Sequence, residues 1–360
     1  MMIDTQTVLN CLRDVIDPCL KTPLLARHAL HLERKADDAF EVIITLGYPA
    51  NHLHESIRSC VLNVVNSIAG IRLSISFDER IQSYPVKSKI PALPRVKNII
   101  AVASGKGGVG KSSVSVNLAL ALAQAGACVG LLDADIYGPS QPAMLGVADD
   151  IRPEFLDKQY FKPIEAYGLQ TMSIGYLVTD KTPMVWRGPM VSGALQQLTN
   201  QCLWQDVDYL IIDMPPGTGD IQLTMAQKIP VTASVIVTTP QNIAVLDAQK
   251  AIEMWSKVHV PVAGVIENMA THLCSQCGHE EAIFGEDGGT QLSQEYQTPL
   301  LGRLPLTKTI REHLDQGKPT VIQEPDSAIA HQYRDIATAM AAQLLTLTGN
   351  TARAAVIATD

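Results

Sequence analysis

The chain has no excess of basic residues and no long uninterrupted hydrophobic run. Its 28 lysines and arginines face 36 aspartates and glutamates, which gives a formal net charge of −8. Nucleic acids and anionic membranes are usually bound by a basic face, so this balance argues against both as partners. A membrane-crossing helix needs roughly 18 consecutive apolar residues. The longest candidate, residues 118–132, is interrupted by Gln124 and Gly126, so no transmembrane helix is expected.

The N-terminus also lacks the apolar core of a secretory signal, because polar residues such as Asp4 and Arg13 recur within it. The seven cysteines are an odd number, which argues against a disulfide framework in a chain of this length. We therefore expect a soluble, cytoplasmic protein with free thiols. Five cysteines lie mostly in apolar patterns and are predicted to be core residues, namely Cys11, Cys19, Cys60, Cys128 and Cys202.

The sequence is rich enough in apolar residues to fill two cores, since 46% of its 360 residues are hydrophobic. Residues 1–80 are predicted to form a small α/β domain and residues 81–96 a proline-containing linker. Over residues 97–349, apolar strand candidates alternate with helical stretches, which predicts an α/β domain with a doubly wound, mostly parallel sheet. Residues 350–360 are expected to be a flexible tail. The clearest predicted strands are residues 99–103, 129–132, 209–212, 234–237 and 262–266.

A glycine-rich segment directly after the first of these strands fits the phosphate-loop pattern G-x-x-x-x-G-K-[ST]. It reads Gly105-Lys106-Gly107-Gly108-Val109-Gly110-Lys111-Ser112-Ser113, and a helical stretch follows it. The glycines allow backbone N–H groups to approach phosphate oxygens, Lys111 supplies a cation, and the Ser112 hydroxyl can complete a Mg²⁺ shell. The alternative is a glycine-rich turn with two solvated lysines, which the flanking strand and helix disfavour. The sequence therefore predicts a nucleotide-binding loop.

Two later strands end in carboxylates. Asp133-Ala134-Asp135 closes the second predicted strand, and Asp213 closes the third, followed by the run Pro215-Pro216-Gly217-Thr218-Gly219-Asp220. A carboxylate at a strand end beside a triphosphate can hold Mg²⁺ or orient an attacking water, although the first pair could equally cap the next helix. The proline–glycine run can respond to a γ phosphate as a switch. Asn268, just past the last predicted strand, can contact a purine edge or can simply form a turn.

Cys274 and Cys277 stand at C-x-x-C spacing, with His272 before them and His279 after them. Such a pair can bind one soft metal centre from a single turn, but it supplies only half of a tetrahedral site. Four thiolates would arise if two chains met across a symmetry axis, giving a [4Fe–4S] cluster or zinc. The spacing alone leaves three alternatives open: a redox pair, a one-chain zinc site using one of the histidines, and two incidental thiols.

Together these motifs resemble the Mrp/ApbC-type iron–sulfur cluster carriers, a branch of the deviant phosphate-loop ATPases. The resemblance runs from about residue 95 to residue 349, and the early Lys106 is the mark of the deviant loop. It also rests on Trp186-Arg187-Gly188-Pro189-Met190 and on Glu267-Asn268-Met269. Residues 1–80 resemble, more weakly, a small domain found in iron–sulfur assembly factors. Some stand-alone members have a cysteine ahead of a proline where this chain has Tyr48-Pro49, so we assign that domain no cluster-ligand role.

The resemblance implies a deviant phosphate-loop NTPase fold and a homodimer with two ATP sites and one bridging [4Fe–4S] cluster on Cys274 and Cys277 of each chain. The protein would receive clusters from iron–sulfur assembly machinery and pass them to apo iron–sulfur proteins, with slow ATP hydrolysis as a conformational switch. The implied site roles are as follows: Lys106 acts across the dimer interface, Lys111 and Ser112 bind phosphate and Mg²⁺, Asp135 places the water, Asp213 supports the metal, and Asn268 contacts adenine.

Two other functions share some of these motifs. A partition- or division-type positioning ATPase would act on DNA or a membrane surface, and it would need a basic face or a basic amphipathic anchor. The last helical stretch, residues 328–347, instead predicts a packing face, with Arg334 and Asp335 as its fixed charges. A nucleotide-switch ATPase with structural zinc at the cysteine pair is the other alternative, and metal analysis would separate it from a cluster carrier.

Overall fold

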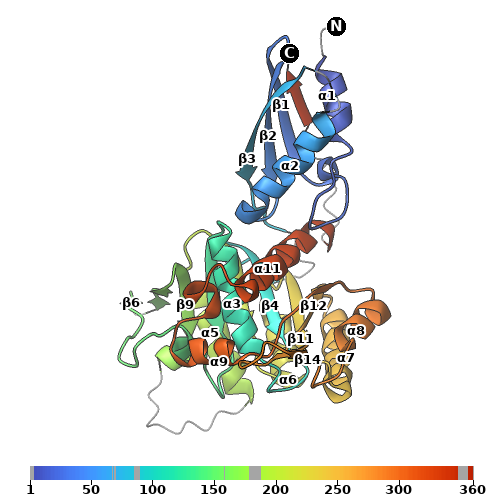
Figure 1. The fold of residues 1–360 in the computed structure, drawn as a ribbon. Helices are drawn as coiled ribbons and strands as arrows, with labels where there is room; N and C mark the ends of the chain where they lie inside the picture. Colours follow the sequence, from blue (N-terminus) through green and yellow to red (C-terminus); the bar gives the residue numbers. More distant parts are fainter. Residues whose placement is uncertain are drawn as a thin grey trace. The chain divides into compact units, whose positions relative to one another are not determined.

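The computed structural model describes residues 4–66, 68, 70–84, 90–157, 159–177, 188–347 and 356–359. The chain divides into two compact units (Figure 1). The smaller unit comprises Met1–Gln82 together with Ala341–Asp360, and the larger unit comprises Ser83–Met340. The predicted linker, residues 81–96, is shared between them. Ile81 belongs to the smaller unit and Tyr84 and Leu93 to the larger, and all three side chains are buried, whereas residues 85–89 lie outside the described residues.

The smaller unit contains a four-stranded mixed sheet and two helices. The strand order is β16–β1–β2–β3, where β1 is Ala29–Ala36, β2 is Ala39–Leu46, β3 is Arg72–Glu79 and β16 is Val356–Thr359. β1 and β2 are antiparallel, and β3 is parallel to β2. Every second side chain of β2 is buried, as alternation in a half-buried strand requires. The helices are α1 (Thr5–Leu12) and α2 (His54–Val65), with short 3₁₀ turns at Leu24–Ala26 and Asn51–Leu53.

The C-terminal residues form a strand over part of the segment predicted to be a flexible tail. Residues 356–359 pair in parallel with residues 30–33 of β1. The β-branched residues Val356, Ile357 and Thr359 favour this extended conformation. All four side chains of β16 are exposed, so backbone hydrogen bonding to the edge of β1, rather than side-chain packing, holds the strand. Residues 350–355 and residue 360 lie outside the described residues.

A buried hydrogen-bonded cluster occupies the place where the sequence departs from the assembly-factor pattern. The Tyr48 hydroxyl and the His28 ring both donate to the Asp17 carboxylate, at 2.9 and 2.6 Å. The backbone N–H groups of Cys19 and Leu20 donate to the same carboxylate. Burial opposes ionisation of Asp17, but the hydrogen bonds from His28 and Leu20 outweigh it and hold the pKa of this carboxyl below its usual value. Tyr48 thus has a structural role in the smaller unit.

The larger unit is built on an eight-stranded sheet in the order β15–β12–β11–β4–β10–β5–β9–β8. All neighbouring strands are parallel except β8 and β9 at one edge. This confirms the doubly wound, mostly parallel sheet predicted from the sequence. The bounds are β4 Val96–Ala103, β5 Val129–Asp133, β8 Ile164–Ala166, β9 Leu169–Ser173, β10 Val207–Asp213, β11 Ala233–Thr238, β12 Val262–Glu267 and β15 Leu300–Arg303.

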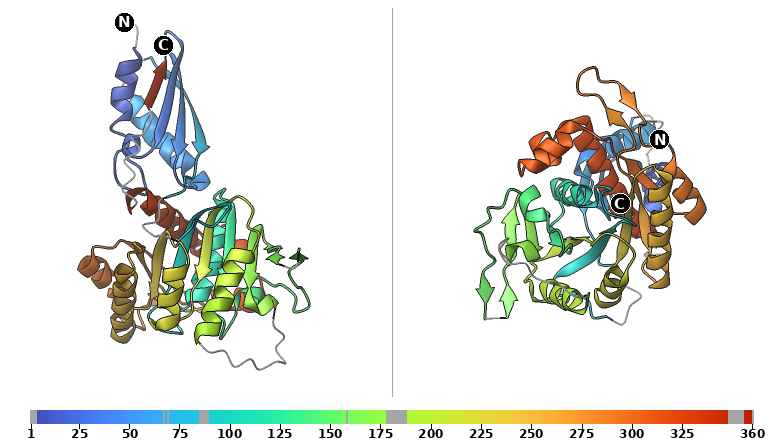
Figure 2. Two further views of the ribbon diagram at one scale, coloured as in Figure 1. Left: turned by 180° about the vertical axis from the view of Figure 1, so that it is seen from behind. Right: turned by 90° about the horizontal axis from the view of Figure 1, so that it is seen from below.

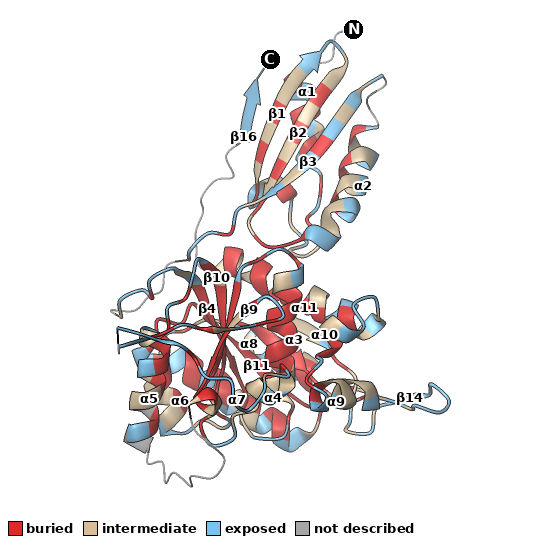
Figure 3. Cartoon of the chain, turned by 90° about the vertical axis from the view of Figure 1, so that its left-hand side faces the viewer, coloured by how far each residue is buried: buried red, intermediate tan, exposed pale blue. Residues whose placement is uncertain are grey.

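Helices cover both faces of this sheet, as a parallel sheet requires. Figure 3 shows α3, α10 and α11 on one side and α5 and α6 on the other, while α7 and α8 pack on β11 and β12. The bounds are α3 Lys111–Gln124, α4 Gln141–Met144, α5 Gly188–Gln201, α6 Asp220–Lys228, α7 Asn242–Lys257, α8 Gly288–Tyr296, α9 Lys308–Asp315, α10 Thr320–Gln323 and α11 Ala328–Leu347, with a 3₁₀ turn at Ile174–Tyr176. Two small hairpins pair β6 (Phe155–Leu156) with β7 (Tyr160–Phe161) and β13 (His272–Leu273) with β14 (Glu280–Glu281).

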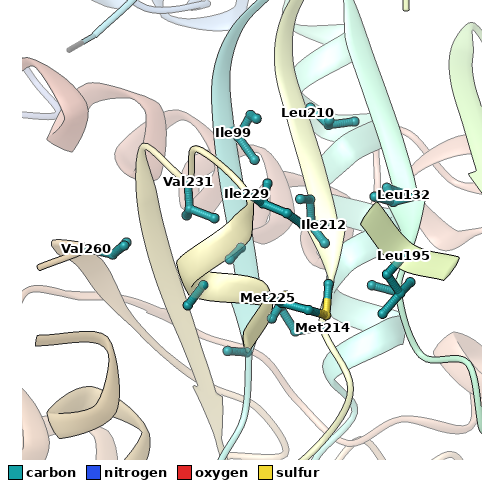
Figure 4. Packing of buried hydrophobic residues seen from close by; sticks show 14 of the residues in the cluster. Ile99, Leu132, Leu195, Leu210, Ile212, Met214, Met225, Ile229, Val231 and Val260 are labelled. Atoms are coloured by element: carbon teal, nitrogen blue, oxygen red, sulfur yellow. The ribbon is translucent and has the colours of Figure 1, made fainter. Parts of the chain in front are cut away.

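Apolar side chains fill the space between the sheet and helices α5 and α6 (Figure 4). Ile99, Leu132 and Leu210 contribute from the sheet, and Leu195 and Met225 contribute from the helices. Each of the five is at most 3% exposed, and burial of such a side chain stabilises the fold by about 1.5–3 kcal/mol. This packing fixes the strands whose ends carry the predicted site residues.

None of the described helices is both long and apolar enough to cross a membrane. The longest, α11, has the packing face predicted from its sequence, since Tyr333, Ile336, Met340 and Leu344 are buried. The structure describes all seven cysteines, and none of them forms a disulfide. Among those predicted to be core residues, Cys202 is buried and three others are half-buried, but Cys128 is exposed. That prediction was wrong because Cys128 lies in the loop before β5 and not in the strand.

Candidate functional site

The predicted site residues meet at the carboxyl-terminal edge of the larger sheet. β4, β5, β10, β11 and β12 run parallel, so the loops that follow them emerge on one side. Val109 and Asn268, 159 positions apart in the sequence, are hydrogen-bonded to each other there. The topology therefore assembles one site from segments that are remote along the chain.

The glycine-rich loop has an open face beside backbone N–H groups. Gly108 and Gly110 both have a φ of +81°, in the region that favours glycine. Gly107 and Gly108 are exposed, and a Cβ added at Gly108 would meet no atom within 4 Å. In the described part of the chain, no hydrogen bond uses the N–H groups of these two glycines. Because α3 begins at Lys111 directly after the loop, the positive end of its dipole lies beside the same space. The loop is thus suited to bind phosphate.

Lys111 and Asp213 form a buried ion pair, with 2.5 Å between Nζ and Oδ1. Asp213 also accepts hydrogen bonds from the Ser115 hydroxyl and the Gln141 amide, both at 2.9 Å. Lys111 donates to the Ser112 hydroxyl oxygen at 3.1 Å. A phosphate group would compete with Asp213 for the Lys111 ammonium. The Asp213 carboxylate and the Ser112 hydroxyl are hard oxygen donors of the kind that Mg²⁺ prefers, so the residues present fit a nucleotide with its magnesium ion.

Gln141 and Ser115 are site residues that the sequence analysis missed. Gln141 donates to the Ser112 carbonyl at 3.1 Å as well as to Asp213, so it ties the end of β10 to the start of α3. Ser115 could have been found, because it stands four residues after Lys111 and therefore on the same face of the helix. No local pattern marks Gln141, which is 72 positions from Asp213.

Asp133 and Asp135 have different environments. Oδ2 of Asp133 accepts hydrogen bonds from the N–H groups of Ser140 and Gln141, at 3.0 and 3.1 Å, where α4 begins. Asp133 therefore caps the next helix, which was one of the two interpretations left open for this pair. Burial, together with the charge of Asp213, raises the pKa of Asp133 to about 7. Asp135 is half-buried; burial raises its pKa as well, and the nearby Lys111 charge opposes that shift.

Lys106 and Ser113 flank the centre of the loop. Lys106 is half-buried, and its carbonyl accepts a hydrogen bond from the Ser104 hydroxyl at 2.9 Å. Among the described residues, no carboxylate forms an ion pair with the Lys106 ammonium. Ser113 lies in the first turn of α3, and its carbonyl accepts from the Asn117 amide at 2.9 Å. The role of Lys106 across a dimer interface stays a prediction.

The proline–glycine run after β10 lies against the glycine-rich loop. The Gly217 N–H donates to the Ser104 carbonyl at 3.1 Å. A Cβ added at Gly107 would lie 3.9 Å from a Pro216 carbon. At the other end, the Gln222 amide donates to the Pro215 carbonyl. The segment predicted to act as a switch is therefore in direct contact with the loop whose occupancy it would sense.

Asn268 holds the glycine-rich loop from the side of β12. Its buried side-chain amide donates to the Val109 carbonyl at 2.8 Å. The next residue, Met269, has a φ of +57°, a left-handed conformation that costs a non-glycine residue on the order of 1 kcal/mol. Because the amide is engaged with the loop, the contact of Asn268 with adenine stays a prediction.

Cys274 and Cys277 lie in the turn of the β13–β14 hairpin, which projects from the body of the larger unit (Figure 2). The Cys274 N–H donates to the His279 carbonyl, and the Gly278 N–H donates to the Cys274 carbonyl, both at 2.9 Å. Hydrogen bonds from the backbone of Cys277 and Gln276 lower the pKa of Cys274, which favours the thiolate that binds metals. Cys277 is exposed and Cys274 half-buried, so both can be reached from outside the chain.

One chain does not complete a metal site with these two thiols. Within the described residues, no three His, Cys, Asp or Glu side chains are grouped so that they could hold a metal ion. Neither His272 nor His279 is grouped with Cys274 and Cys277 in such a set, so the one-chain zinc site stays an untested alternative. A metal centre on this hairpin would need ligands from another source.

Part of the motif set falls outside the described residues. Trp186 and Arg187 of the predicted Trp-Arg-Gly-Pro-Met run lie there. The run ends in α5, where Met190 is 54% exposed.

Comparison with known proteins finds relatives along most of the chain. Residues 95–341 match the model of a ParA family described as the NUBPL iron-transfer P-loop NTPase. An iron-sulfur cluster carrier protein of Pseudomonas fragi is 60% identical over 257 residues, covering 71% of this chain and 90% of its own length. A protein of the same name from Salmonella typhimurium is 50% identical over 338 residues, which cover 94% of this chain and 91% of the Salmonella protein. The mouse iron-sulfur cluster transfer protein NUBPL is 47% identical over 251 residues, which cover 69% of this chain and 78% of the mouse protein.

Solved structures show the same fold in the larger part of the chain. A nucleotide-binding protein from Archaeoglobus fulgidus in complex with ADP has a TM-score of 0.56 at 33% identity, covering 65% of this chain and 90% of its own. The cell division ATPase MinD from Pyrococcus furiosus has a TM-score of 0.51 at 22% identity, and the match covers 68% of this chain and 98% of the MinD chain. The second likeness concerns the fold alone. The deviant phosphate-loop NTPase fold predicted from the sequence is confirmed.

Proposed function

The chain belongs to the iron–sulfur cluster carrier family of P-loop NTPases, and we propose that it binds ATP and delivers a [4Fe–4S] cluster to apo iron–sulfur proteins. The observation that supports this most directly is the combination found in the larger unit. A phosphate loop with carboxylates at two neighbouring strand ends lies there in the same unit as a projecting pair of free thiols. The proposed nucleotide site and the proposed cargo site thus lie in the same compact unit.

The cargo site is proposed to form between two copies of the chain. Four thiolates are the usual ligand set of a [4Fe–4S] cluster, and each chain contributes two of them on an exposed turn. A two-fold axis through the hairpin tips would bring Cys274 and Cys277 of both copies together. Lys106, which has no ion-pair partner among the described residues, would then act on the nucleotide of the other copy.

The nucleotide site is proposed to use its residues in separate roles. Lys111 and the loop N–H groups hold the phosphates, Ser112 and Asp213 hold Mg²⁺, and Asp135 orients the attacking water. Bound Mg²⁺ supplies positive charge that neutralises the phosphate oxygens. We propose that hydrolysis is slow and serves to switch the conformation of the cluster-bearing dimer. Iron–sulfur assembly machinery would supply the cluster, and the absence of a disulfide among the described cysteines supports a reducing compartment such as the cytoplasm as the place of this work.

Anaerobic reconstitution with iron and sulfide tests the cargo site. We expect about four irons and four sulfides per dimer and the broad visible absorption of a [4Fe–4S] cluster. Cys277→Ser should abolish cluster uptake, and without cluster it should bind ATP as tightly as the cluster-free wild type, because Cys277 lies in the projecting hairpin and not in the nucleotide loop. Cys128→Ser is the matched control, since that thiol is also exposed but lies in the loop before β5 and not in the hairpin.

The same preparation tests delivery. Loaded protein should restore activity to an apo-[4Fe–4S] dehydratase, and loaded Cys128→Ser protein should do so equally well. Tightly bound zinc with no cluster uptake would contradict the carrier function and would identify the cysteine pair as a structural zinc site. Full cluster content in Cys277→Ser would show that the ligands lie elsewhere.

A further inference from the structure

Residues 268–273 connect the nucleotide loop to the cysteine hairpin within the larger unit. We propose that Asn268 is a positioning residue that transmits the state of the glycine-rich loop to the two thiols along this segment. The inference rests on the proposed function for the identity of the two sites, and it concerns the side chain that couples them. It follows from three features of the segment: its contact with the loop, its rigidity, and its continuity with β13.

The first feature is a tight contact at the loop. The Asn268 amide donates to the Val109 carbonyl at 2.8 Å in a buried position. Gly110 packs so closely on this amide that an added Cβ would overlap the Asn268 nitrogen, and that Cβ would lie 3.5 Å from the Met269 Cε atom. Any movement of the carbonyl at Val109 must therefore either break this hydrogen bond or move Asn268.

The second feature is a firm anchor on the opposite side of Asn268. Its own N–H donates to the Thr238 carbonyl at 2.8 Å. The preceding Glu267 carboxylate, 1% exposed, accepts a hydrogen bond from Arg303 at 2.9 Å and another from the Gly289 N–H. The end of β12 is thus held in place, so a displacement at Asn268 passes forward along the chain and is not absorbed behind it.

The third feature is a ladder of backbone hydrogen bonds that runs from the segment to the hairpin. Ala270 donates to the Leu304 carbonyl at 3.0 Å, and Leu306 donates to the Thr271 carbonyl at 2.6 Å. Leu273 then donates to the Leu306 carbonyl at 3.2 Å, immediately before Cys274. The segment is therefore stiff from Met269, in its left-handed conformation, to the start of the thiol-bearing turn.

Phosphate binding provides the displacement. Where an N–H group of the loop shifts toward a phosphate oxygen, the carbonyl of the same peptide unit shifts with it because the unit is planar. Val109 lies in the middle of this loop, so its carbonyl reports on loop occupancy. The coupling is reciprocal: the factor by which nucleotide changes the affinity of the two thiols for their ligand is also the factor by which occupation of the thiols changes nucleotide affinity.

Hydrogen–deuterium exchange of the full-length protein without cluster tests the proposal. The informative amides are those of Leu273, Cys274 and Gly278, which are hydrogen-bonded in the hairpin. With saturating ADP·Mg²⁺, we expect their exchange rates in the wild-type protein to change by about fivefold or more. In Asn268→Ala that response should be lost, although the protein still binds ADP at the higher concentration required.

Two further variants complete the test. Asn117→Ala is the matched control, because its buried amide also donates to a backbone carbonyl beside the loop, that of Ser113 at 2.9 Å, and it is not connected to the hairpin by this ladder. It should keep the wild-type response. Met269→Gly keeps the Asn268 contact but relieves the left-handed constraint, so it should reduce the response without weakening ADP binding.

The outcomes separate this inference from the proposed function. An unchanged hairpin in the ADP-bound wild-type protein, or a full response in ADP-bound Asn268→Ala, would overturn the coupling role of Asn268. If Asn268→Ala does not fold, an undiminished response in Met269→Gly would overturn it. Failure of cluster reconstitution would remove the carrier function but would leave the exchange experiment, which needs no cluster, as a complete test of the coupling.

Discussion

The buried pair of Lys111 and Asp213 serves both binding and stability. Lys111→Ala should abolish ATP binding, because the phosphates lose their cation. It should also lower the free energy of unfolding by about 3–5 kcal/mol, since Asp213 keeps its burial and loses its counter-charge. Calorimetric titration with ATP and urea unfolding measure the two effects. Unchanged ATP affinity would contradict the assignment of the phosphate loop.

The raised pKa of Asp133 makes a prediction about pH. The native state binds this proton more tightly than the unfolded chain, in which the carboxyl titrates near 3.8. Protonated Asp133 therefore makes its full contribution to the free energy of unfolding below about pH 4, and this contribution is lost as the pH rises through about 7. The free energy of unfolding of the wild type, relative to Asp133→Asn, should fall across that window by at most about 1.4 kcal/mol per pH unit. Urea unfolding at several pH values measures it, and a relative stability that rises with pH would contradict the assignment.

At the scale of single residues, the sequence predicted the site wherever a motif has a fixed spacing. Lys111 and Ser112 follow from the phosphate-loop pattern, and Asp213 follows from its place at the end of an apolar strand. The contacts that surround these residues could not be predicted from any such pattern. Gln141 lies on a short helix in another loop, and its approach to Asp213 depends on the order of the strands. Asn268 was found, but its bond to Val109 required the folded sheet.

At the scale of the element, the glycine-rich loop depends on one position above all. Gly110 has a φ of +81°, and an added Cβ would overlap the Asn268 amide. Gly110→Ala should therefore abolish ADP binding and destabilise the protein by about 1–3 kcal/mol. Gly193→Ala in α5 is the control, because a Cβ there meets nothing within 4 Å, and alanine should stabilise that helix by about 0.5–1 kcal/mol. Titration with ADP and thermal unfolding measure both variants, and normal ADP affinity in Gly110→Ala would show that the loop tolerates a side chain.

The elements that the sequence predicted well are the buried ones. The five clearest strands correspond to β4, β5, β10, β11 and β12, because continuous apolar runs mark strands that are covered on both faces. The antiparallel edge formed by β8 and β9 was not predicted. These strands have only three and five residues, which is too short for a clear hydrophobic pattern in the sequence. The β13–β14 hairpin was predicted only as a loop, because its pairing involves two residues on each side.

At the scale of the whole molecule, the two units use different structural devices. The larger unit buries a parallel sheet between helices and places its chemistry on loops at one edge. The smaller unit combines a mixed sheet with the buried cluster around Asp17, whose hydrogen-bonding partners all lie within that unit. The sequence located the change of composition near residue 80, but it could not show that residues from 341 onward return to the smaller unit.

The strand β16 has a consequence for handling the protein. It is the only cover that the described residues provide for the outer edge of β1, and an uncovered edge is a template for pairing with another chain. Removal of residues 356–360 should therefore promote edge-to-edge self-association, with sheet-rich oligomers that grow as concentration rises. Light scattering of the truncated and full-length proteins measures this, and equal scattering at high concentration would show that the edge is protected by other means. A fusion that displaced β16 from β1 would uncover the same edge, so it should show the same concentration-dependent self-association as the truncated protein.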